Sequence, residues 1–94
     1  MTQHELLVML KVDLGISSSA FDERLKQYIS AASRAIQAEG AAIDLNDAND
    51  CQLVIMYAAW LWRRRDSMDG MPRMLRYALN NRVFGEKMGG GADG

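Results

Sequence analysis

Cysteine, histidine and proline each occur only once in this chain of 94 residues. A single cysteine, Cys51, excludes an internal disulfide and a zinc site built from several cysteines, and it fits a reducing compartment. The single histidine, His4, has no second histidine or thiol to act with, so we expect neither a metal site nor a catalytic centre around it. No phosphate-binding glycine loop or nucleophile motif is present. The sequence therefore predicts a protein that is not an enzyme, binds no cofactor and has no small-molecule substrate.

Long hydrophobic runs and secretory features are also lacking. The longest uncharged apolar segment, residues 53–62, is far shorter than the roughly 20 residues that a membrane helix needs. The N-terminus has neither the basic flank nor the cleavage site of a secretory signal. Abundant Ala, Leu, Met and Arg favour helices. We expect one soluble all-α domain over residues 1–84 with no membrane contact, followed by a flexible glycine-rich tail at 85–94.

Helical periodicity places two helices in the first half of the chain. Thr2 and Glu5 have the spacing of a capping box at the start of the first helix, and Gly15 is expected to end it. Serines at 17–19 offer caps for a second helix, which ends at Gly40. The regular apolar stripe of that helix consists of Phe21, Leu25, Tyr28, Ile29, Ala32 and Ile36.

The third helix is the most apolar part of the chain. Asn46 or Asp47 is expected to cap it, and apolar side chains surround it between residues 53 and 62. Such a helix must be in contact on more than one side. Either it crosses the centre of the monomer, or part of it faces another subunit. We expect Trp60 in the core and Trp62 at an interface.

A fourth helix is expected to begin at Pro72. Because Asn80 and Asn81 have low helix propensity, this helix should end near them, and Val83 and Phe84 should leave it as an extended segment. The methionines, seven in the whole chain, fall mainly on predicted apolar faces, which favours core filling. Together these segments predict a small bundle of about four helices.

Charge is distributed unevenly between the two halves. Residues 1–50 contain eight acidic and four basic residues, a net charge of −4, whereas residues 51–94 contain seven basic and four acidic residues, a net charge of +3. The basic half is dominated by Arg63, Arg64, Arg65, Arg73, Arg76 and Arg82. These arginines can be ordinary surface charge at a helix end, a contact for an acidic partner protein, or a contact for phosphate backbones. A pI of about 5.7 disfavours nucleic acid, so a small DNA-binding helical protein that uses the Arg63–Arg82 patch is the alternative reading.

Two segments carry a resemblance to a known family. They read LKVDLGISSSAFDERLKQYISAASRAIQ at 10–37 and YAAWLWRRRDSMDGMPRMLRYALNNRVF at 57–84. Over roughly residues 5–84 the chain resembles the head-tail connector, or adaptor, proteins of long-tailed bacteriophages and prophages, also called DNA-packaging proteins. The resemblance implies a ring beneath the portal protein, a docking surface for a tail or stopper protein, and a channel that passes the genome without reading it. It also implies assembly in the bacterial cytoplasm, a final place in the neck of the virion, and no catalytic residues.

A ring of identical copies requires contacts between two different patches of each subunit. We therefore predict a contact between the basic end of one copy and an acidic part of the next, with Trp62 adding burial. The contact joins Arg63, Arg64, Arg65 and Arg76 of one copy to Asp22, Glu23 or the 44–50 loop of its neighbour. Val83, Phe84 and the tail are predicted to bind the portal or a neighbouring subunit as an extended segment.

Overall fold

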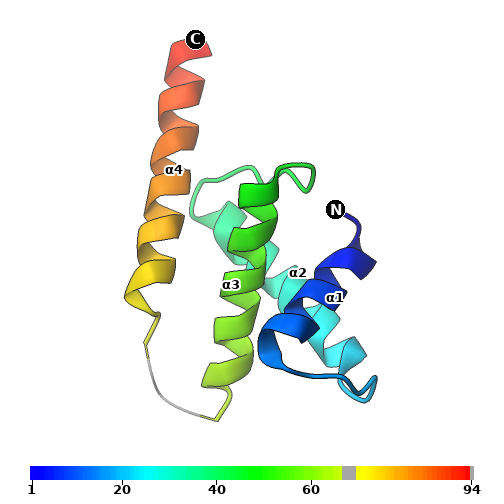
Figure 1. Cartoon of the computed structure of the whole chain (residues 1–94). Coiled ribbons are helices and arrows are strands. Elements are labelled where there is room, and N and C mark those ends of the chain that lie inside the picture. The colour runs from blue at the N-terminus through cyan, green and yellow to red at the C-terminus, as the bar shows by residue number, and fades with distance from the viewer. Residues whose placement is uncertain (67–69, 94) are drawn as a thin grey trace.

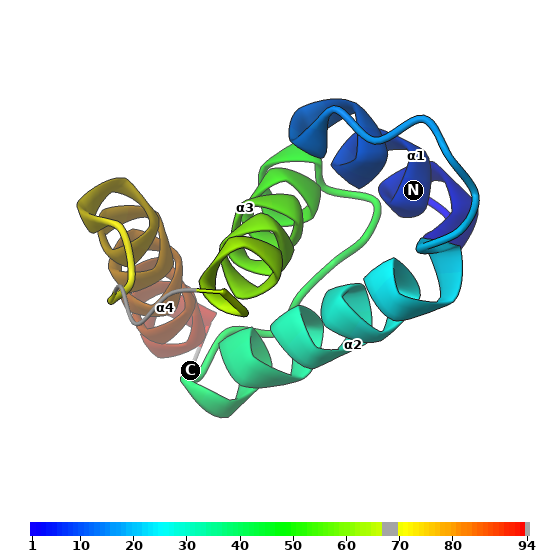
Figure 2. The ribbon, with the colours of Figure 1, turned by 90° about the horizontal axis from the view of Figure 1, so that it is seen from below.

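The computed structural model describes residues 1–66 and 70–93, with side chains as far as residue 88. Its helices are α1 (Gln3–Leu14), α2 (Asp22–Ala38), α3 (Ala48–Arg64) and α4 (Arg73–Asp93), and no strand occurs within the described ranges. Helix α3 lies between α4 on one side and the pair α1 and α2 on the other (Figures 1 and 2). The predicted all-α bundle of four helices is confirmed.

Helix ends follow the capping signals in the sequence. The Thr2 hydroxyl accepts a hydrogen bond from the Glu5 N–H at 3.1 Å, and the Glu5 carboxylate accepts one from the Thr2 N–H at 2.9 Å, which completes the capping box. Gly15 ends α1 with φ of 72°, a left-handed conformation that glycine adopts without strain. Asp47 caps α3 by accepting from the N–H groups of Asn49 and Asp50. These predicted boundaries are confirmed.

The start of α2 differs from the prediction. Phe21 occupies the N-cap position and makes no side-chain capping bond, so the serines at 17–19 do not cap this helix. The Ser18 hydroxyl instead accepts from the N–H of Ala20, two residues on, at 3.0 Å. Serine side chains form such local turns readily, and here the turn ends before the helix begins.

The core is built around α3. This helix packs against α1, α2 and α4, and it supplies more buried apolar side chains than any other element. The largest fully buried apolar side chains are Leu6, Leu10, Leu25, Ile29, Ile36, Val54, Ile55, Leu75 and Leu79. Cys51 is buried among them as a small core residue, with its thiol 3.1 Å from the Leu45 carbonyl oxygen. Of the two explanations for the apolar surface of α3, passage through the centre of the monomer is the observed one.

Helix α4 corrects the prediction for the C-terminal part. It does not end near Asn80 and Asn81 but continues through Val83 and Phe84, which are helical rather than extended. Helix propensity is a weak preference, and tertiary contacts made beyond residue 81 override it here. The flexibility predicted for residues 85–94 stays a prediction.

The methionines with described side chains do not fill the core. Met1, Met9, Met74 and Met88 are exposed, and Met56 is only partly buried, as is Met71. The prediction of core filling is therefore wrong for the four exposed methionines, whereas Met56 and Met71 pack against the edge of the core. Met68 lies outside the described residues. Exposed methionines on a small protein are characteristic of adaptable binding surfaces, because the thioether side chain is flexible and polarizable.

Candidate protein interface

A buried ion pair fastens α4 to the rest of the bundle. The Arg82 guanidinium donates to both carboxylate oxygens of Asp50, at 2.7 and 3.3 Å, and also to the Ala42 carbonyl at 2.6 Å. The Asp50 side chain is only 2% exposed. Burial alone raises the pKa of Asp50, but the Arg82 hydrogen bonds, the Asp44 N–H and the positive charge of Arg82 outweigh it, and the pKa is lowered. The carboxylate is therefore ionised and paired at neutral pH.

Three further contacts support this pair. Glu86 accepts from the Ala42 N–H at 2.8 Å, and Arg76 donates to Glu39 at 3.0 Å. Val83 packs against the backbone at Gly40, whose φ of 115° suits glycine. We call this set of contacts between α4 and residues 39–50 the α4 clamp. The clamp favours continuation of the helix past residue 81, because Arg82 and Glu86 reach their partners from the helical conformation.

The three arginines at the C-terminal end of α3 point to different partners within the chain. Arg63 lies 4.0 Å from Asp13. The Arg64 guanidinium stacks 4.8 Å above the Trp60 ring, and that of Arg65 stacks 3.6 Å above the ring of Trp62 and donates to its carbonyl. Such cation–π contacts are worth about 0.5–1 kcal/mol at exposed sites. The arginines do not form one uniform basic surface.

The predicted acidic partners are also occupied inside the chain. Asp22 forms an ion pair of 2.8 Å with Lys11, and Glu23 lies 3.4 Å from Lys26. In the 44–50 loop, Asp47 caps α3 and Asp50 belongs to the α4 clamp. The structure therefore brings the predicted basic and acidic residues into contacts within one subunit. Their role between subunits stays a prediction.

Trp62 and Trp60 have different surroundings. Trp62 makes edge-to-face contacts with Phe21 and Tyr28 of the same chain, with ring centroids 5.4 and 6.0 Å apart. Trp60 contacts Tyr57 in the same way at 5.4 Å and also borders a cavity. Both indoles are partly buried. Part of the Trp62 ring surface is thus already covered within the monomer. The interface role of Trp62 stays a prediction.

The side of α4 turned away from the core carries three large, exposed apolar side chains among polar ones. Tyr77, Phe84 and Met88 are 61%, 65% and 60% exposed, whereas Leu75 and Leu79 on the other side of the helix are buried. We call Tyr77, Phe84 and Met88 the outer face of α4. The sequence analysis missed this face because it ended the helix at residue 81. Once the helix is continued, the spacing of seven and four residues places these three side chains on one side.

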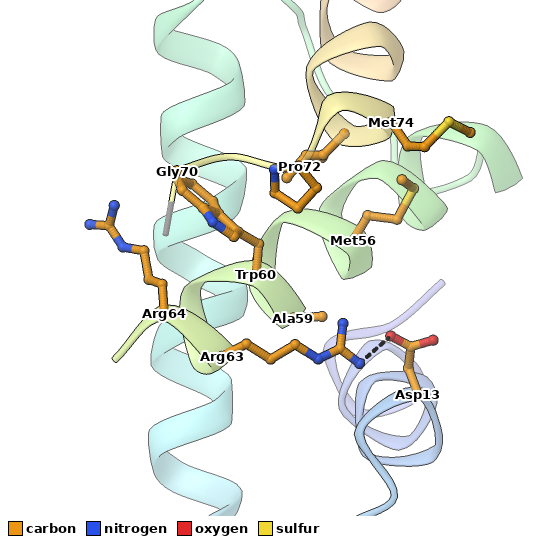
Figure 3. A pocket seen from close by; sticks show the side chains of 10 residues that line it. Asp13, Met56, Ala59, Trp60, Arg63, Arg64, Gly70, Pro72 and Met74 are labelled. Carbon is orange, nitrogen blue, oxygen red and sulfur yellow. Dashed lines mark ion pairs between the residues drawn. The ribbon is translucent and has the colours of Figure 1, made fainter. Parts of the chain in front are cut away.

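A groove runs along α3 between α1 and α4. It consists of three adjoining cavities with volumes of about 470, 390 and 250 Å³. Met56 lines the first and second cavities, Gln52 the second and third, and Asp13 the first and third. Figure 3 shows the first cavity, where Met56, Trp60 and Met74 line the wall and the pair of Arg63 and Asp13 lies at the edge. We call these three cavities the α3 groove.

Among the described residues, no group of three or more His, Cys, Asp or Glu side chains could hold a metal ion. No helix in the same ranges is long and apolar enough to cross a membrane. Comparisons with protein-family models, with curated proteins and with solved structures find no match for this chain.

Proposed function

We propose that the protein is a head-tail connector, or adaptor, of a long-tailed phage or prophage. In this role it is a structural protein that forms a ring beneath the portal protein, joins the capsid to the tail or a stopper protein, and retains or passes the genome. The support is the resemblance of residues 10–37 and 57–84 to that family, together with a small all-α fold of the kind the resemblance implies.

The observation that carries the proposal is the apolar outer face of α4. Tyr77, Phe84 and Met88 are largely exposed although the monomer already has a complete core. Further apolar side chains are exposed on α1, where Val12 is 77% accessible. Several large apolar side chains exposed on one side of a helix are typical of a surface that binds other proteins. A connector needs such surfaces for its neighbours in the ring and for the portal.

Electron microscopy of the purified protein tests this proposal. The full chain is imaged alone and after mixing with the portal protein of the same phage or prophage, and we expect a ring attached to one end of the portal. A control portal from an unrelated phage should remain bare. If the chain neither associates with itself nor binds its portal at any concentration tried, the proposal is wrong.

A second candidate is a small DNA-binding protein, and the exposure of Arg63, Arg64 and Arg65 at one helix end favours it. Against it, the other arginines of the patch that the structure pairs, Arg76 and Arg82, bind acidic side chains of the same chain. Affinity for duplex DNA separates the two functions. DNA binding that weakens steeply between about 50 and 200 mM salt would support the second candidate, since phosphate contacts release counterions.

A further inference from the structure

We propose that the outer face of α4 of one copy docks in the α3 groove of the next copy. This inference rests on the proposed function, because it names the two unlike surfaces that join neighbours in the ring. The contact is heterologous, so each copy uses its outer face on one side and its groove on the other. It replaces the charge-driven contact expected from the sequence as the main source of binding energy.

Some of the charges predicted for the interface are already paired within the chain. Arg76 binds Glu39, and Asp22 binds Lys11. Recruiting these charges to a neighbour would require breaking contacts within the monomer. The side chains of Arg63 and Glu23 remain 62% and 89% exposed, so charge can add to the contact while the exposed apolar side chains supply most of the burial.

The outer face is short enough to fit within the groove. It extends from Tyr77 to Met88, eleven positions, which at 1.5 Å per residue is about 17 Å. The α3 residues that line the groove extend from Asn49 to Arg64, fifteen positions or about 22 Å. An apolar helix face laid into a groove between two helices is a common mode of protein recognition.

The exposed area of the outer face is close to the minimum that a specific interface needs. The aromatic rings of Tyr77 and Phe84 each leave roughly 100–150 Å² to be buried at their observed exposure. With Met88 and the flanking side-chain stems, one face offers on the order of 400–500 Å², and both partners together about 1,000 Å², the lower limit for a specific interface. A single contact of this size is weak. A closed ring gives every copy two such contacts, and attachment to the portal raises the effective concentration further.

Charge suggests the direction of docking. Lys87 lies beside the C-terminal end of the outer face, and Asp13 lies at the end of the groove near Arg63. The pair of Asp13 and Arg63 is long, at 4.0 Å, and the Asp13 side chain is 47% exposed. Asp13 can therefore meet Lys87 of a neighbour once the exposed Arg63 side chain, which lines the same cavity, turns aside into solvent. In that arrangement the docked helix runs in the same direction as α3, with Phe84 and Met88 nearest α1.

Cysteine trapping tests the contact directly. One full-length chain carries Phe84→Cys and another carries Val12→Cys, both at exposed positions, while native Cys51 is buried. After mixing and mild oxidation, we expect disulfide dimers between unlike variants to exceed dimers of either variant with itself by at least fivefold. In the control, a chain with Gln37→Cys, on the exposed surface of α2, takes the place of one of the two cysteine variants in the mixture. Dimers mainly between two Phe84→Cys chains, or no excess over the control, would overturn the proposal.

A second experiment uses charge instead of a covalent bond. Phe84→Glu blocks the outer face, Val12→Glu blocks the groove edge, and Gln37→Glu changes an exposed residue away from both. In sedimentation velocity, each blocked variant should associate at least about tenfold more weakly than the native chain, and an equimolar mixture should form a two-copy species. Native-like association of either blocked variant alone would overturn the inference. If the blocked variants form rings on the portal as the native chain does, this contact is wrong while the proposed function stands.

Discussion

Replacing Arg82 by methionine should destabilise the protein by about 2–4 kcal/mol. Arg82→Met removes the hydrogen bonds of 2.7 and 3.3 Å to Asp50 while keeping an apolar stem of similar reach. Removing one partner of a fully buried ion pair typically costs about 3–5 kcal/mol, because the other charge stays buried without compensation. The lower range applies here because the Arg82 side chain is 25% exposed, and Asp50 keeps the Asp44 N–H at 2.9 Å.

The pH dependence of this loss follows from the direction of the Asp50 pKa shift. In the native protein, burial raises the pKa of Asp50. The hydrogen bonds from Arg82 and the Asp44 N–H and the charge of Arg82 lower it by more, so the net shift of the pKa is downward. A lowered carboxyl pKa contributes stability above the unfolded value of about 3.9, and that stability is lost as the pH falls through the folded value. In Arg82→Met the stabilising partner is gone. The difference in unfolding free energy between native and variant protein should therefore be largest near pH 7 and shrink below about pH 4.

Urea unfolding at pH 7, 5 and 3, followed by far-ultraviolet circular dichroism, measures the effect. Arg76→Met is the matched control, because its partner Glu39 is more exposed and such a pair is worth at most about 1 kcal/mol. Arg82→Met combined with Asp50→Asn should cost less than the sum of the two single changes, since the buried charge disappears with its partner. A cost for Arg82→Met no greater than for Arg76→Met, or a difference that does not depend on pH, would refute the role of the clamp.

Three further changes test other parts of the structure. Trp62→Ala should lower the free energy of unfolding of the monomer by about 2–4 kcal/mol, because the indole packs between Phe21 and Tyr28; a change confined to self-association would instead identify an interface residue. Asp47→Ala should cost about 1 kcal/mol through loss of the α3 cap, measured by urea unfolding, whereas Asp47→Asn should cost much less. Gly15→Ala should cost about 1 kcal/mol in the same assay because of the left-handed φ of 72°.

The parts of the fold that could be predicted from the sequence are those governed by local chemistry. The capping box at Thr2, the glycine stop at Gly15 and the cap at Asp47 depend on residues within three or four positions, and all three are observed. The central position of α3 follows from its apolar circumference. Local signals fail where one side chain has two alternative hydrogen bonds of similar strength. The Ser18 hydroxyl could cap α2, but it forms a local turn instead.

The end of α4 could not be predicted because its cause is not local. Asn80 and Asn81 lower helix propensity, but Arg82 reaches Asp50 across 32 positions of the sequence and Glu86 reaches Ala42 across 44. Contacts of that separation leave no periodic signal. The same error hid the candidate interface, because Phe84 joins Tyr77 on one face only if the helix continues.

The arginines illustrate the same limit for the site. Clustered charge in a sequence predicts a charged surface, yet here the arginines divide among Asp13, two tryptophans, Glu39 and Asp50. The three-dimensional structure is needed to tell which charged side chains are paired within the chain and which are free to bind a partner. Exposed apolar side chains are the clearer guide in this protein, because the core is complete without them.

The clamp is physically connected to the interface that we propose. Helix α4 carries the outer face, and its position relative to the α3 groove is set by Arg82, Glu86 and Arg76. In a ring, the angle between these two surfaces fixes the rotation from one copy to the next and therefore the number of copies that closes the circle. A polar clamp defines such an angle more narrowly than apolar packing alone, since charged hydrogen bonds are directional. Arg82→Met, at temperatures where the variant remains folded, should thus broaden the distribution of copy numbers in micrographs of assembled protein, whereas Thr2→Ala, which weakens the cap of α1 and changes no residue of the clamp, should leave the distribution unchanged.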